Sequence, residues 1–139
     1  MMSKNAKKVV SRILSVSLLL CMAISILSIS AFAVTPRWVS INSIDLNIAF
    51  NGERGNALGS ASKQSTANKI EGTLTLYELV DGEWEYIDEW YNSRTRGTLA
   101  VSGDFTCESG VTYKAVFVVT AYTGTASETE TVEYIDTCP

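Results

Sequence analysis

Residues 111–122 read VTYKAVFVVTAY. Valine, tyrosine, phenylalanine and threonine all favour extended strands. The middle of the segment, Ala115 to Val119, is apolar at every position, whereas a strand with one solvated face alternates between polar and apolar residues. The segment is therefore predicted to be a central strand of a sheet.

Period-two alternation continues outward from this segment in both directions. The further strands are predicted at residues 43–50, 57–63, 69–79, 84–91, 98–105 and 127–135. Residues 57–63 are the weakest of these because their side chains are small. Seven short strands separated by regular turns predict an all-β fold, namely an immunoglobulin-like β-sandwich of about seven antiparallel strands. A small β-barrel is the alternative.

The Asp81-Gly82 pair is a typical two-residue hairpin loop and predicts how the strands on either side of it pair. In this register Tyr77 lies opposite Tyr86, and Trp90 lies opposite Thr73. The alternative is a one-residue bulge, which would turn the second strand over and bury both of its tryptophans. It would bury Asp88 as well, and an unpaired buried carboxylate is costly.

The unbulged register places several aromatic side chains together on the outer face of one sheet. These side chains are Tyr77, Trp84, Tyr86, Trp90 and Tyr122. An exposed aromatic face of this size predicts a binding surface. The competing interpretation is that the tryptophans belong to the core, because large aromatic residues are usually buried.

A turn at residues 123–126 predicts the pairing of the last two strands. It places Phe117 opposite Val132 and Ala115 opposite Tyr134, so that the apolar side chains share one face. The predicted register is therefore consistent with a single buried face.

Extending this register brings the end of the chain close to the turn that precedes residue 111. Cys138 would lie near Val111, and Cys107 lies on the turn just before it. In an oxidising compartment an even pair of cysteines predicts a disulfide, here between Cys107 and Cys138. Two free thiols are the alternative.

The first 33 residues have the three parts of a secretory signal peptide. A basic start precedes an apolar run from Ile13 to Ile29, and Ala31 and Ala33 stand where a signal peptidase reads small residues. We expect a signal helix in residues 1–33, cleavage after Ala33, and a secreted, extracellular domain at residues 34–139 that meets a membrane only in transit. An uncleaved anchor is the alternative, since about 17 apolar residues are the lower limit for a membrane span.

Charge and composition argue against several kinds of chemistry. All 15 acidic residues but only 7 of the 11 basic residues lie after Ala33, so the mature chain carries a formal net charge of −8. A surface this acidic repels phosphate backbones, and we expect no nucleic-acid partner. The chain has no histidine, so it cannot form a Ser-His-Asp or Cys-His nucleophile system. Zinc sites need histidine or several cysteines, and the two cysteines of the mature chain do not suffice. We therefore expect no enzymatic activity, catalytic residue, metal site or cofactor.

A set of structural motifs runs through most of the mature chain. It comprises Ile70-x-Gly72-x-Leu74-x-Leu76-Tyr77, Asp81-Gly82-x-Trp84, Trp90, Ser109-Gly110-x-x-Tyr113, Val119-Thr120-Ala121 and Gly124. In these motifs the chain resembles a loose group of small, uncharacterised secreted proteins of Gram-positive, clostridia-like bacteria with a single immunoglobulin-like domain. The resemblance implies a fold and a compartment but no catalytic residue. Tyr113 resembles the tyrosine that braces a corner in many such sandwiches, and a plain buried aromatic is the alternative.

Taken together, the sequence predicts a non-enzymatic secreted binding module that acts through its exposed aromatic face, with a protein or a glycan as partner. One alternative is a carbohydrate-binding module, because exposed aromatic rings stack on sugars. The other is a secreted structural domain that has no ligand. The sequence does not predict the oligomeric state.

Overall fold

A computed structural model describes residues 38–139, which fall within one compact unit. Its strands are β1 (Ile41–Asn51), β2 (Arg54–Lys63), β3 (Lys69–Val80), β4 (Glu83–Arg94), β5 (Leu99–Thr106), β6 (Thr112–Thr123) and β7 (Ala126–Thr137). Within these residues there is no helix that could cross a membrane. The predicted signal helix and its cleavage residues, Ala31 and Ala33, lie outside the described residues.

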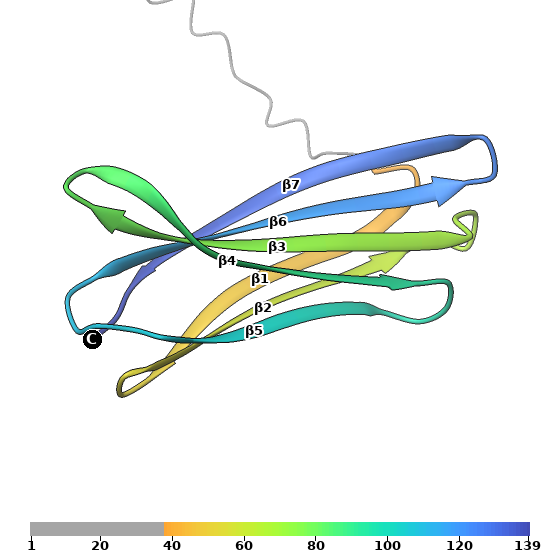
Figure 1. Cartoon of the computed structure of the whole chain (residues 1–139). Coiled ribbons are helices and arrows are strands. Elements are labelled where there is room, and N and C mark those ends of the chain that lie inside the picture. The colour runs from red at the N-terminus through yellow and green to blue at the C-terminus, as the bar shows by residue number, and fades with distance from the viewer. Residues whose placement is uncertain (1–37) are drawn as a thin grey trace, which may run out of the picture. The chain divides into compact units, whose positions relative to one another are not determined.

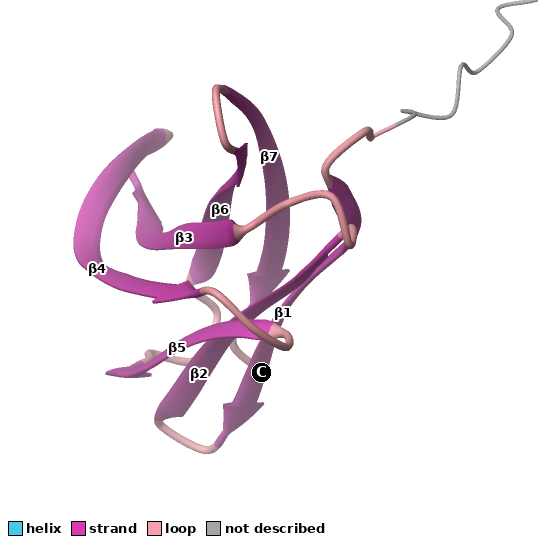
Figure 2. Ribbon diagram, turned by 90° about the vertical axis from the view of Figure 1, so that its right-hand side faces the viewer, coloured by secondary structure: helices cyan, strands magenta, loops and turns pink. Residues whose placement is uncertain are grey.

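The strands form two antiparallel sheets that pack face to face (Figures 1 and 2). One sheet has the order β1-β2-β5 and the other has the order β4-β3-β6-β7. The prediction of an all-β fold with seven antiparallel strands is thus confirmed. The predicted weak strand at residues 57–63 is a full strand in the structure, because β2 lies between β1 and β5 and is paired on both sides.

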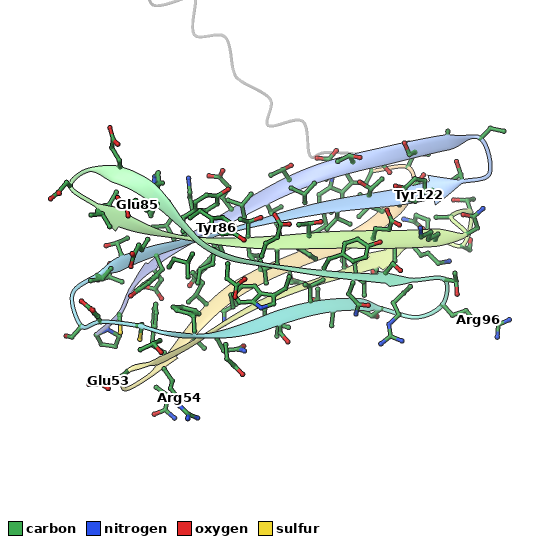
Figure 3. All side chains as sticks on the ribbon, in the orientation of Figure 1. Glu53, Arg54, Glu85, Tyr86, Arg96 and Tyr122 are labelled. Carbon is green, nitrogen blue, oxygen red and sulfur yellow. The ribbon has the colours of Figure 1, made fainter. Side chains whose placement is uncertain are left out.

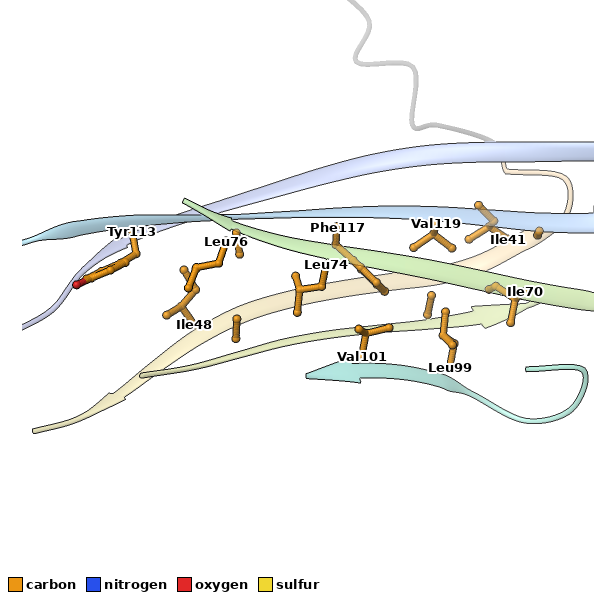
Figure 4. Close-up of a cluster of buried hydrophobic side chains, with 14 of the residues drawn as sticks. Ile41, Ile48, Ile70, Leu74, Leu76, Leu99, Val101, Tyr113, Phe117 and Val119 are labelled. Carbon is orange, nitrogen blue, oxygen red and sulfur yellow. The ribbon is translucent and has the colours of Figure 1, made fainter. Parts of the chain in front are cut away.

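The core lies between the two sheets (Figure 4). Every second side chain of β6 is buried there, namely Tyr113, Ala115, Phe117, Val119 and Ala121. The side chains between them, including Val116 and Val118, are half-buried on the opposite face. The apolar middle of the segment is therefore explained by a strand with neighbours on both sides and partial cover on its outer face.

Close approach of the two sheets depends on glycines that face bulky rings. A Cβ on Gly59 of β2 would lie 2.7 Å from the Phe117 ring, and a Cβ on Gly72 of β3 would lie at the same distance from that ring. The Phe117 side chain therefore fills the space that two missing side chains leave. This arrangement fixes the separation of β2 and β6 at the centre of the core.

The pairing of the last two strands agrees with the prediction. Phe117 lies opposite Val132 and Ala115 lies opposite Tyr134. The Cys138 amide donates a hydrogen bond of 2.9 Å to the Val111 carbonyl, as the extended register requires. The register from the turn at residues 123–126 to the end of the chain is therefore confirmed.

The pairing of β3 with β4 departs from the prediction halfway along the hairpin. Near the turn Tyr77 lies opposite Tyr86 as expected, but a β-bulge at Ile87 shifts the remaining pairs by one residue. Trp90 consequently lies opposite Leu74 instead of Thr73 and packs against the core. The predicted place of Trp90 on the outer face is wrong, because the bulge turns its ring inward, where it packs over Gly103 of β5 in the space that a side chain would otherwise fill.

Tyr113 braces the turn between β5 and β6. Its side chain is 1% exposed, and its hydroxyl accepts a 3.0 Å hydrogen bond from the backbone N–H of Glu108. Its ring packs against Phe50 and Phe105, with centroids 5.9 and 5.1 Å away. Tyr113 therefore has both expected roles, because it is a buried core aromatic and also the hydrogen-bonded support of a corner.

One carboxylate ties the start of β1 to β7. Glu128 accepts backbone hydrogen bonds from Val39 at 3.0 Å, Ser40 at 2.5 Å and Ile41 at 3.1 Å. Partial burial by itself raises the pKa of Glu128, but the three N–H donors outweigh it, so the pKa is lowered from its ordinary value. The first described residues are thus held to the neighbouring sheet by a charged acceptor.

Replacing Glu128 by glutamine is expected to lower the free energy of unfolding by about 1 kcal/mol at neutral pH, since an amide offers these donors one neutral oxygen. A carboxylate with a lowered pKa stabilises the fold fully above its unfolded pKa and loses this effect as the pH falls through the folded pKa. Urea unfolding at pH 7 and at pH 3 should therefore show a difference between wild type and Glu128→Gln that shrinks in acid. The exposed Glu133→Gln variant is the control, and equal losses in both variants would contradict the prediction.

Candidate functional site

The candidate site is the outer face of the four-stranded sheet, which is the face turned away from β1, β2 and β5. The strand registers align four side chains across this face: Ile135 of β7, Lys114 of β6, Tyr77 of β3 and Tyr86 of β4. We call these four residues the aromatic row. Its ends are open to solvent, because Ile135 is 54% exposed and Tyr86 is 62% exposed.

The aromatic row is held together by ring and cation contacts. The Tyr77 and Tyr86 rings meet edge to face with centroids 6.3 Å apart. The Lys114 ammonium lies 5.2 Å from the Tyr77 centroid and 4.6 Å from the centroid of Trp84, which is the residue next to the row on β4. One charged side chain therefore covers two ring faces, and such contacts stabilise an exposed cation modestly.

Tyr86 sits in a negative environment. Partial burial is the largest of the effects that raise the pKa of its phenol, followed by the charges of Asp88 and Glu89. The phenol is thus neutral at physiological pH and is available as a hydrogen-bond donor and acceptor.

A second polar cluster lies at the other end of the same face. Glu71 accepts hydrogen bonds from the Tyr91 hydroxyl at 3.0 Å and from the Tyr122 hydroxyl at 2.8 Å, and it forms an ion pair with Lys69. The hydrogen bond from Lys69 is the largest of the effects that lower the pKa of Glu71, followed by the one from Tyr122. The Lys69 ammonium also lies 5.3 Å from the centroid of the Tyr122 ring.

The stretch between the two ends combines polar, charged and apolar side chains. Thr75 and Val116 form its floor next to the aromatic row, with Glu89 beside them on β4 and Glu133 beside them on β7. The Thr75 hydroxyl donates to Glu89 Oε2 at 3.2 Å. Both carboxylates are exposed, so the middle of the outer face carries negative charge.

The structure brings together only part of the predicted aromatic face. Tyr77, Trp84 and Tyr86 lie side by side, whereas Tyr122 lies opposite Lys69, about 26 Å further along the strands (Figure 3). Trp90 points to the inner side, because of the bulge at Ile87. The predicted surface is thus divided into two separate clusters on one face.

The sequence prediction of this face omits three of its residues, namely Ile135, Tyr91 and Lys114. Tyr91 is 61% exposed and points outward, because the bulge that turns Trp90 inward turns its neighbour outward. Lys114 was not recognised as part of the aromatic row, although alternation along residues 111–122 places it on the same face as Tyr122. The glycine at residue 103 was the available signal for the bulge, since glycine within a strand often marks a close approach.

Strand β4 bends from one sheet towards the other beyond the bulge (Figure 2). The Asn92 side chain donates a 2.8 Å hydrogen bond to the Ala100 carbonyl, which joins β4 to the edge strand β5. A shallow, open hollow of about 430 Å³ lies beside this contact and is lined in part by Glu89 and Tyr91. Bulges typically bend the strand that contains them, and here the bend brings Trp90 over Gly103.

The two cysteines lie at the end of the domain near the C-terminus. Cys107 and Cys138 are both 1% exposed, and their sulfur atoms are 2.7 Å apart. Burial is the largest cause of a raised pKa at the Cys138 thiol, followed by the hydrogen bond to Cys107. Both thiols also point towards the Gly52 carbonyl of the β1–β2 turn.

Comparisons with known proteins supply no family for this chain. No protein-family model and no curated protein matches it. Among solved structures, the chain is similar to Spo0M, a sporulation control protein from Bacillus subtilis, with 13% sequence identity and a TM-score of 0.40. The match covers 68% of this chain and 48% of that one, so this chain spans about half the length of Spo0M. A similarity this low supports no statement about function.

Proposed function

We propose that this protein is a secreted, non-enzymatic binding module that contacts a partner protein through the outer face of its four-stranded sheet. The observation that carries the proposal is the gathering of open side chains on this face. Tyr86 and Tyr91 are exposed by 62% and 61%, and both lie on β4. Large aromatic side chains grouped on one face, rather than scattered over a surface, are typical of interaction sites.

Carbohydrate binding is the weaker candidate for the same face. Stacking on a sugar needs an open ring face, and the Lys114 ammonium covers one face of Trp84 and one face of Tyr77. A protein partner can use ring edges, hydroxyl groups and the exposed Ile135 side chain equally well.

We also propose that the fold is an immunoglobulin-like sandwich. The proposal is supported by the strand order β1-β2-β5 against β4-β3-β6-β7, in which the first two strands and the last two strands pair as neighbours. The hydrogen bond from Glu108 to the Tyr113 hydroxyl is a second support, because a tyrosine in this place is typical of such sandwiches.

Secretion and a Cys107–Cys138 disulfide belong to the same proposal. The short distance between the two buried sulfur atoms supports the disulfide, which would close a loop of 31 residues. In the chain-entropy model such a loop adds about 3–4 kcal/mol to the free energy of unfolding. Intact mass of the protein from the culture medium should begin at residue 34 and lack two hydrogens. A mass that includes residues 1–33, or two alkylatable thiols after unfolding, would contradict it.

The test of the binding face is an amide chemical-shift titration of the processed chain with a panel of short peptides and oligosaccharides. Peptides should shift amides around the aromatic row and Tyr91, and Tyr86→Ala should remove these shifts while changing the free energy of unfolding by less than about 0.5 kcal/mol. The matched control is Tyr134→Ala, which removes a partly exposed tyrosine from the other face of β7. Shifts confined to other surfaces would reject the outer face as the binding site.

A further inference from the structure

The β3–β4 hairpin has an extreme charge distribution. Between Lys69 and Arg94 the sequence contains no basic residue, but it contains seven carboxylates, namely Glu71, Glu78, Asp81, Glu83, Glu85, Asp88 and Glu89. Glu78 and Glu85 even lie directly opposite each other, where like charges destabilise a strand pair. The hairpin therefore attracts cations over its whole length.

One part of this hairpin combines negative charge with open aromatic rings. Beyond the turn, the outward side chains of β4 include Tyr86, Glu89 and Tyr91, in this order along the strand. We call these three residues the β4 strip. Glu89 is exposed between two tyrosines that are each more than 60% exposed. A carboxylate flanked by ring faces is the chemistry that recognises guanidinium and ammonium groups.

Two charges of the outer face, those of Glu71 and Lys114, are already satisfied within the domain, and the open carboxylate of Glu133 lies three strands away on β7. Glu71 has the Lys69 ammonium and two tyrosine hydroxyls as partners, and this is the one ion pair among residues 38–139. Lys114 lies over two aromatic rings. Glu89, in contrast, accepts a single long side-chain hydrogen bond, from Thr75 at 3.2 Å, and no other donor for it is found in the described part of the chain. Its charge is therefore available to a partner.

We propose that the β4 strip binds lysine or arginine side chains of a basic, extended segment of the partner protein. The inference rests on the proposed function, since it names the chemistry of the partner at the same face. Successive rows of the outer face are about 7 Å apart, which is also the spacing of alternate side chains in an extended chain. An arginine on the partner can thus pair with Glu89. The side chains two residues before and two residues after this arginine then lie over Tyr86 and Tyr91.

The probe is an alternating arginine–serine peptide of nine residues, titrated into the processed chain by calorimetry and by amide chemical shifts. Serine-only and glutamate–serine peptides of the same length are the comparison probes. We expect binding of the arginine peptide only, weakening with added salt. Glu89→Gln should weaken it about tenfold, and Tyr86→Leu should weaken it several-fold, because each removes one of the three contacts that the β4 strip makes to the arginine side chains of the peptide.

Glu83→Gln is the matched control, because Glu83 lies on the same hairpin, is exposed, and points away from the β4 strip. It removes the same charge from the molecule, so it should change the affinity by less than about twofold if binding is local. Equal losses in the two glutamine variants would overturn the inference. If neutral or acidic peptides shift the outer face and the arginine peptide does not, the inference fails while the proposed function stands. If only oligosaccharides shift this face, the inference fails and carbohydrate binding replaces a protein partner. If no probe shifts this face, both fail.

Discussion

Replacing Phe117 by alanine is expected to remove about 3–5 kcal/mol from the free energy of unfolding. The Phe117 side chain is 0% exposed, and its ring occupies the space over Gly59 and Gly72, which have no side chains that could fill the cavity left by truncation. The cost of a cavity is largest where the surroundings cannot collapse, and here both neighbours are backbone of regular strands. A domain of this size has a total stability of about 5–15 kcal/mol, so the variant would be close to its unfolding threshold.

Urea denaturation followed by circular dichroism measures this loss, and Val118→Ala is the matched control. Val118 is the next residue of β6 and is half-buried on the outer face, so its truncation should cost about 1 kcal/mol or less. A loss below about 1 kcal/mol in Phe117→Ala would mean that the two sheets are not separated by this ring. The same result would contradict the packing of the Phe117 ring against Gly59 and Gly72.

Some of the architecture follows from local sequence alone. The register of β6 and β7 could be predicted because the turn is short and only one alignment buries Phe117 and Val132 together. The position of Cys138 beside Val111 then follows by extension of the same alignment. Where a tight turn and a single buried face agree, there is no competing register.

The β3–β4 hairpin shows where this reasoning reaches its limit. Its turn predicts the pairs closest to it correctly, but the bulge at Ile87 depends on β5, a strand distant in sequence from the turn. Trp90 turns inward because Gly103 leaves room for its ring. No local pattern around residues 83–94 contains that information.

The outer face could be predicted only in part for the same reason. Tyr77, Trp84 and Tyr86 lie before the bulge, and alternation places them correctly. Tyr91 lies beyond it, where the shift of one residue turns this side chain outward. The charge on the β4 strip is visible in the sequence, but its position between two open rings is a consequence of the bulge.

The contact between Trp90 and Gly103 leads to the second large effect. An ideal Cβ at Gly103 would lie 1.8 Å from Trp90 Cε2, well inside any permitted contact. Gly103→Ala is therefore expected to lower the free energy of unfolding by about 3 kcal/mol, at the upper end of overpacking costs, because either the ring or β5 has to move. Ser102→Ala, an exposed neighbour on β5, is the control and should cost less than about 0.5 kcal/mol.

The double variant Trp90→Ala/Gly103→Ala separates overpacking from other effects of the added methyl group. Trp90→Ala alone should cost about 2–4 kcal/mol, below the range for a fully buried ring, because Trp90 is partly buried. With the ring gone, the methyl group at residue 103 has room, so the second substitution should add almost nothing or recover part of the loss. Chemical denaturation of the four proteins gives the coupling energy, which should exceed about 1.5 kcal/mol. If the two losses in the free energy of unfolding simply add, Trp90 does not lie over Gly103. The bulge at Ile87, which turns Trp90 inward and Tyr91 outward, would then be contradicted.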